Sequence, residues 1–211
     1  MTAAGPAAAL PAGVALMERA LGYTLGGLQL VTPELVGRPT PCRDWDLGAL
    51  LRHMHESLRT LHEAIVVGRL GVEVDGPPPH SYAGQGSPSR TQGSAPAVMQ
   101  TVRELRSLGC RLVGAWVNAG DVPDVVIRDH VLTPSIVAAA GATEIAVHGW
   151  DVGRACGADR PIPPDLAEEI LWLCPLFVTD DDRGRRFAAP VRVPAAASPS
   201  DRLVAFLGRR P

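Results

Sequence analysis

Apolar residues recur at helical spacing through four segments of the chain, and proline and glycine separate these segments. The spacing predicts a first helix over residues 11–31, which ends before Thr32-Pro33 because a residue that precedes proline is disfavoured in the helical region. A second helix is predicted over residues 46–68, with Asp46 as its N-cap. Its core-facing stripe would be Leu47, Leu50, Leu51, Met54, Leu58, Leu61 and Ile65.

The middle of the chain contains a segment without periodicity, and two further helical patterns follow it. Residues 71–95 are rich in Gly, Pro and Ser, and a loop of this length in a compact domain is either mobile or functional, for example a lid. A third helix is predicted from Ala95 to about Asn118, and a fourth opens at Thr133-Pro134 with a cap and a first-turn proline. The third helix would bury Val98, Val102, Leu105, Leu112, Val113 and Trp116.

After the fourth helix the pattern changes. A shorter helix is predicted after Pro164, and a Ser200-capped helix follows an Asp/Arg-rich turn and an extended stretch. Four long helices around one core are most economically arranged as an all-α, antiparallel four-helix bundle with a short C-terminal extended and helical tail. We expect the bundle over residues 1–160, and the C-terminal helix and tail, packed on the bundle, over residues 161–211.

Composition limits the partners and the compartment. With 211 residues, 46% of them hydrophobic, the chain can bury one sizeable core, and its net charge of −2 includes no basic stripe. This argues against nucleic acid and against an anionic membrane surface as partners. The N-terminal segment lacks the features of a signal peptide, and the longest charge-poor run still carries acidic residues, so we expect no membrane span and a cytoplasmic protein. The cysteines (Cys42, Cys110, Cys156 and Cys174) include no C-x-x-C pair and are expected to be core thiols.

The most informative segment is residues 131–152, in which Glu144, His148 and Asp151 are the only ionisable residues. Their spacing places all three on one face of a helix that is otherwise apolar. Burying two carboxylates and an imidazole costs roughly several kcal/mol of desolvation free energy unless a partner neutralises them. A divalent metal ion is the simplest such partner, and a hydrogen-bonded Glu144–His148 pair without metal is the alternative.

Two ligands from one helix do not hold a metal tightly, so a third must come from elsewhere. The second helix offers His53, His55 and His62. His53 lies on a side of that helix lined by small residues, whereas His55 and His62 flank the opposite edge of the apolar stripe. Periodicity alone does not choose between the three histidines.

Three motifs carry a resemblance to a known family. The segment PTPCRDWDLGALLRHM, which contains Cys42, Trp45 and His53, resembles the N-terminal signature of the mycothiol-dependent maleylpyruvate isomerases, within the DinB-like metal-binding four-helix bundles. TEIAVHGWDVGRA, with Glu144 and His148, looks like the second signature of the same family. ASPSDRLVAFLGRRP is similar to the tail of an actinobacterial branch of that superfamily.

The resemblance implies a divalent ion held by His53, Glu144 and His148, with water in the open positions. Zinc is the expected metal, and the same donors suit Fe2+ or Ni2+. Asp151 would orient His148 or a neighbouring helix rather than bind the ion. Cys42 would serve packing or a turn rather than act as a nucleophile.

In the resembling family the metal serves thiol chemistry, in which mycothiol as a thiolate adds to an electrophilic carbon and gives isomerisation or S-conjugation. The resemblance therefore implies a metal-dependent thiol transferase or isomerase, with mycothiol as co-substrate and a small electrophilic molecule as substrate. About 55 residues follow the fourth helix, so the further C-terminal domain of the two-domain isomerases is expected to be absent or reduced to a tail, and the substrate to differ from maleylpyruvate.

Two alternatives to this function stay open. The bundle could be a thiol-independent metal-dependent hydrolase, or a lyase or cyclase of secondary metabolism, in which the metal activates water or a substrate carbonyl. It could also be a non-catalytic metal-binding module. A homodimer also stays open, because related bundles often pair through their helices, although no sequence feature here fixes an interface.

Overall fold

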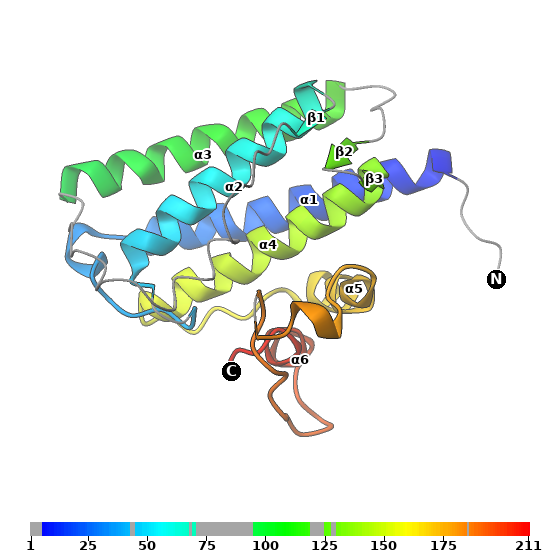
Figure 1. Ribbon diagram of the computed structural model, residues 1–211. Helices are drawn as coiled ribbons and strands as arrows, with labels where there is room; N and C mark the ends of the chain where they lie inside the picture. Colours follow the sequence, from blue (N-terminus) through cyan, green and yellow to red (C-terminus); the bar gives the residue numbers. More distant parts are fainter. Residues whose placement is uncertain are drawn as a thin grey trace.

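The computed structural model describes residues 6–42, 45–67, 69–70, 95–118, 125–127, 130–184 and 186–211. The helices and strands, in chain order, are α1 (Pro6–Gly27), α2 (Leu47–Val67), β1 (Arg69–Leu70), α3 (Ala95–Asn118), β2 (Val125–Ile127), β3 (His130–Leu132), α4 (Pro134–Ala155), α5 (Pro164–Leu173) and α6 (Pro199–Phe206). Short 3-10 turns lie at Leu28–Leu30, Pro33–Leu35, Cys174–Leu176 and Asp180–Asp182. The long helices α1 to α4 lie side by side as a bundle, and α5 and α6 lie beside its α4 side (Figure 1). The prediction of an all-α bundle is confirmed.

The helix directions refine the predicted antiparallel arrangement. Helices α1 and α4 are parallel to each other, because Gly13 packs on Ala138 near the start of both and Thr24 packs on Gly149 near the end of both. They run opposite to α2 and α3, which are also parallel to each other (Figure 1). Consecutive helices α2 and α3 therefore do not form a hairpin.

The length of the connection explains how α2 and α3 can be parallel. With a rise of about 1.5 Å per residue, helix α3 is roughly 36 Å long. The chain between residues 71 and 94 has enough residues to return over that distance. Of the predicted loop or lid, residues 71–95, positions 71–94 lie outside the described residues, and Ala95 begins α3. A small sheet that periodicity did not predict pairs β1 with β2 in parallel and β2 with β3 in antiparallel register, at the end of the bundle where α2 and α3 terminate (Figure 1).

Close packing of α1 on α4 depends on a glycine next to the candidate site. At Gly149 the backbone of α4 meets the side chain of Thr24, whose hydroxyl donates a hydrogen bond of 2.8 Å to the carbonyl of Ile145. The contact joins a donor on α1 to a backbone acceptor on α4 inside the core, where Thr24 is only 3% exposed. It therefore fixes α4 against α1 at the turn that carries His148.

Helix boundaries follow the predicted caps at most ends. The Asp46 carboxylate accepts a hydrogen bond of 2.7 Å from the backbone of Ala49, as the predicted N-cap of α2 requires. Helix α1 begins at Pro6 rather than at residue 11, because Pro6 offers an equally good first-turn proline further upstream.

The predicted cap of the last helix, Ser200, lies two residues after the observed cap, Ser198. The hydroxyl of Ser198, not that of Ser200, accepts the capping hydrogen bond from the backbone of Asp201, and Pro199 takes the first turn. Ser200 is instead buried, and its hydroxyl accepts a hydrogen bond from the backbone of Ile162. The Ser200 side chain thus joins α6 to the segment before α5.

The end of α6 turns the chain back toward the bundle. Gly208 has φ +84°, and the backbone N–H groups of Gly208 and Arg209 donate to the carbonyls of Ala205 and Val204. This is the Schellman pattern that closes a helix through a left-handed residue. A side chain at Gly208 would also collide with the backbone of Ala188, so glycine is required for two reasons. Because of this turn, Arg209 points toward α4.

None of the helices in the described part of the chain combines the length and the apolar character that crossing a membrane would need.

The seam between α1 and α4 gives a stability prediction. Gly149→Ala should lower the free energy of unfolding by about 1–3 kcal/mol, because the new methyl group would overlap Thr24 and lie 3.2 Å from its Cα. The same substitution at Gly22, an exposed position of α1 with no described atom within 4 Å of the new group, should instead stabilise by up to about 1 kcal/mol. Urea denaturation of both variants measures the difference, and equal effects would contradict the packing role of Gly149.

Candidate metal centre

One carboxylate oxygen lies between two imidazoles at the centre of the candidate site. Oε1 of Glu144 is 2.6 Å from Nε2 of His53 and 3.2 Å from Nε2 of His148. Glu144 and His148 come from successive turns of α4, while His53 comes from α2, which runs in the opposite direction alongside α4. The antiparallel packing of these two helices therefore brings the third group to the pair that spacing had predicted.

The three groups converge closely enough to share a cation. Their ligand atoms all lie within 4.8 Å of one another, and the two imidazole rings meet edge to face with centroids 5.0 Å apart. Burial increases from Glu144, whose side chain is 35% exposed, to His148, which is 4% exposed. Two neutral imidazole nitrogens and a carboxylate oxygen form a donor set that suits zinc and other divalent first-row metals. The residues therefore fit a divalent cation.

Asp151 holds the far side of the His148 ring. Nδ1 of His148 donates a hydrogen bond of 2.9 Å to Oδ2 of Asp151, whose side chain is fully buried. Because Nδ1 carries the proton in this bond, the lone pair of the neutral ring is on Nε2, the nitrogen that faces Glu144. This is the carboxylate–histidine arrangement that orients metal-binding imidazoles in other proteins.

An arginine from the C-terminal tail completes the line of charges. Nη2 of Arg209 lies 3.0 Å from Oδ2 of Asp151, and Nε lies 3.4 Å from Oδ1, so the guanidinium contacts both oxygens of the carboxylate. The Arg209 side chain is only 11% exposed. A charge as deeply buried as that of Asp151 requires such a partner. No pattern along the sequence signals this contact, because 58 residues separate its two members.

The charges of the site shift three pKa values. Burial opposes the ionisation of Glu144, but the imidazoles of His148 and His53 outweigh this and hold its pKa well below the ordinary value. Burial likewise opposes the charged form of His148, but Glu144 and Asp151 raise its pKa to about 9. For Asp151, the Arg209 guanidinium and His148 overcome burial and lower the pKa. Without a metal, the site is therefore a network of ion pairs with a protonated His148.

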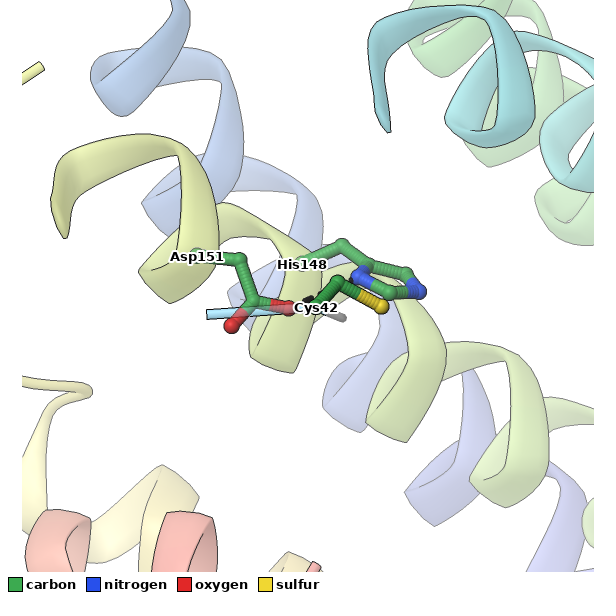
Figure 2. Close-up of side chains that lie close together, drawn as sticks. All are labelled: Cys42, His148 and Asp151. Carbon is green, nitrogen blue, oxygen red and sulfur yellow. Dashed lines mark hydrogen bonds and ion pairs between the residues drawn. The ribbon is translucent and has the colours of Figure 1, made fainter. Parts of the chain in front are cut away.

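Cys42, which was expected to serve packing or a turn rather than act as a nucleophile, also lies close to His148 and Asp151. Its sulfur, a nitrogen of His148 and a carboxylate oxygen of Asp151 all lie within 4.8 Å of one another, and Figure 2 shows the three side chains together. Cys42 precedes α2 in a turn in which the Thr40 hydroxyl donates to the Cys42 carbonyl and accepts from its backbone N–H. His148 is thus a member of two potential ligand groups.

Two further side chains, those of Trp45 and Ser57, contact the group formed by His53, Glu144 and His148. The ring of Trp45 lies 4.6 Å from that of His53 and 6.3 Å from that of His148, which gives the site an aromatic wall. The Ser57 hydroxyl lies 3.3 Å from Oε1 of Glu144. Ser57 follows His53 by one helical turn, so spacing could have indicated it, whereas Trp45 precedes the helix and has no periodic relation to it.

The other two histidines of α2 lie away from Glu144. His55 faces α3, where its Nε2 is 3.7 Å from a carboxylate oxygen of Glu104. His62 lies about two and a half turns beyond His53, at roughly 3.6 residues per turn, and is partly exposed. Of the three candidate histidines on this helix, His53 is the one that the structure brings to Glu144 and His148 on α4.

Comparisons with known proteins identify the family of this chain. Residues 18–153 match the family described as the mycothiol maleylpyruvate isomerase N-terminal domain, and this range contains every member of the candidate group. Two similar proteins of Mycobacterium tuberculosis, the uncharacterized proteins MT0763 and Rv0738, are each 25% identical over 182 residues, which is 85% of this chain and 87% of the relative. No solved structure matches the chain.

The geometry predicts which histidines a metal requires. His53→Ala should lower the affinity for Zn2+ by at least about tenfold, because it removes one of three converging donors. His55→Ala removes an imidazole from the same helix but not from the site and should leave the affinity unchanged. Competition with a chromophoric chelator measures both affinities, and a larger loss in His55→Ala would exclude this site.

The raised pKa of His148 predicts a pH dependence. Nε2 must lose its proton to bind a cation, so the apparent Zn2+ affinity should rise by roughly tenfold per pH unit from about pH 7 and level off near the folded-state pKa of about 9. Without metal, the His148 ion pairs stabilise the fold fully below the unfolded-state pKa of 6.5, and this contribution is lost as the pH rises through about 9. The increase in Tm on adding Zn2+ should therefore grow over this interval, and a constant increase would contradict proton displacement at His148.

Proposed function

Because this chain belongs to the mycothiol maleylpyruvate isomerase N-terminal domain family, we propose that His53, Glu144 and His148 hold a divalent cation and that the site is an enzyme centre for thiol chemistry. The observation that carries this proposal is the convergence of two imidazole nitrogens and one carboxylate oxygen within 4.8 Å, with Asp151 bound to the opposite nitrogen of His148. Zinc is the cation that such a donor set suits best among the abundant ions.

The number of donors supports a catalytic role. The group in the described part of the chain supplies three donors to a cation that takes four or more, which is typical of catalytic rather than structural zinc sites. A cation bound by His53, Glu144 and His148 would replace the protons that Glu144 shares with the two imidazoles. It would thereby neutralise the carboxylate and accept the lone pairs of both rings. Exposure of about a third of the Glu144 side chain leaves a side from which a small molecule can reach the centre.

The balance of charge favours an anionic ligand. Arg209 neutralises Asp151, so that Glu144 alone remains to offset the two positive charges of a divalent cation when both histidines are neutral. One positive charge is then left in a largely buried place, where a thiolate would neutralise it. The charge balance therefore favours an anionic ligand over a neutral one, and mycothiol in the name of the family supports a thiolate as that ligand.

Each neighbouring side chain has a task in this proposal. A bound divalent ion would stabilise the thiolate form of a small thiol such as mycothiol and could polarise a substrate carbonyl. Asp151 keeps the Nε2 lone pair of His148 toward the cation. Trp45 covers His53 with an apolar face, which excludes water from one side and offers a surface for a small electrophilic substrate. The reaction type is a transfer or isomerisation that begins with addition of the thiolate to an electrophilic carbon.

Cobalt substitution tests thiol binding directly. In protein loaded with Co2+ in place of Zn2+, addition of mycothiol should produce a thiolate-to-cobalt charge-transfer absorption in the near ultraviolet, with one equivalent bound. S-methyl mycothiol, which cannot form a thiolate, is the matched control and should give no such absorption. Calorimetry on the zinc protein should show binding of mycothiol that chelation of the metal removes. Mycothiol that binds equally well without metal would contradict the proposal.

A further inference from the structure

The imidazole of His148 faces two sets of donors, and only one of them can take the cation. The first set is the group that His148 forms with His53 and Glu144, and the second is the group that it forms with Cys42 and Asp151 (Figure 2). Both sets have ligand atoms within 4.8 Å of one another. Zinc, cobalt and other thiophilic ions bind a sulfur, nitrogen and carboxylate set at least as readily as one without sulfur. Proximity of donors alone therefore does not explain a preference for the first set.

Arg209 distinguishes the two sets. Its guanidinium contacts both carboxylate oxygens of Asp151, at 3.0 and 3.4 Å, and Asp151 belongs to the second set only. Arg209 also interacts electrostatically with Cys42 and Glu144, but Asp151 is its strongest charge partner. Arginine stays protonated at every accessible pH, so this positive charge is permanent. A metal ion in the second set would have to share Asp151 with a buried cation or displace it from its partner, and both are unfavourable.

We propose that Arg209 selects the metal position: its charge excludes cations from the Cys42–His148–Asp151 set and directs them to the His53–Glu144–His148 set. This inference rests on the proposed function, because it presumes that the first set binds a cation. Arg209 acts through Asp151 and is a positioning residue in this scheme. By the same contact it holds the Asp151 carboxylate against Nδ1 of His148, so one side chain both blocks the second set and orients the shared ligand of the first.

The fold delivers Arg209 to this position with little freedom. The Schellman turn after α6 fixes its backbone through the hydrogen bond from its N–H to the carbonyl of Val204. Nη1 of the same side chain donates to the carbonyl of Leu207 at 3.2 Å, which holds the guanidinium from behind. The neighbouring Arg210 is exposed and serves as a matched control with the same charge.

The test is the absorption spectrum of the Co2+ protein in the absence of any added thiol. The wild-type protein and Arg210→Gln should bind one equivalent without thiolate-to-cobalt absorption, because Cys42 is not a ligand. Arg209→Gln should still bind about one equivalent, since the two sets share His148, but should gain this absorption as Cys42 and Asp151 become accessible to the ion. The double variant Arg209→Gln/Cys42→Ser should lose it again, which identifies the sulfur.

A conservative variant separates the charge of Arg209 from its geometry. Arg209→Lys keeps a cation but cannot contact both oxygens of Asp151. Because the positive charge is retained, Arg209→Lys should show no thiolate absorption. Its Co2+ affinity should fall by roughly tenfold, because the lysine holds Asp151 less well. Circular dichroism of each variant establishes that the fold is retained.

Two results would overturn the inference. One is a wild-type spectrum with thiolate absorption that Cys42→Ser removes, because Cys42 would then be a native ligand beside Arg209. The other is a folded Arg209→Gln protein with the wild-type spectrum and affinity. The second result leaves the proposed function standing, because the metal is still bound by the first set. The first result leaves it standing only when His53→Ala still lowers the Co2+ affinity, whereas a wild-type protein that binds no Co2+ and no Zn2+ would overturn the proposed function together with the inference.

Discussion

A single carboxylate oxygen connects the two halves of this bundle at its centre. Oε1 of Glu144 lies within 3.2 Å of imidazole nitrogens on α2 and on α4, so that one acidic atom joins helices of opposite direction. The charge is neutralised outward from this point, because Asp151 supports His148 and Arg209 supports Asp151. The His148 and Asp151 side chains are buried deeply enough that each of these charged groups requires a partner. The candidate site is therefore part of the structure that keeps the bundle together.

Most of the helical framework could be predicted from local patterns. The apolar stripe of α2 and its Asp46 cap involve residues a few positions apart, and such patterns specify a helix without knowledge of its neighbours. Helix direction does not follow from local patterns, because the connection between α2 and α3 is long enough to permit either a parallel or an antiparallel pair. The short strands at the end of the bundle were missed because two or three residues carry no measurable alternation.

The candidate site also contains residues that local patterns predict and residues that they do not. Glu144, His148 and Asp151 could be predicted because one helix carries all three, and the structure brings them into contact. The choice of His53 needed the resemblance to a family, because helical periodicity describes where a residue points on its own helix and not what it meets. The placement of Cys42 and Arg209 beside His148 and Asp151 depends on the path of the chain before α2 and after α6, which no spacing rule describes.

The glycine seam at Gly149 has a consequence for motion. Thr24 locks α1 to α4 there, and α2 packs along α3, so the bundle consists of two helix pairs with His148 on one and His53 on the other. Internal motion should then consist of a hinge movement of one helix pair relative to the other, because the close-packed seam within a pair resists shear. An ion held by both histidines would act as a clasp across this hinge, and its release would permit the pairs to part.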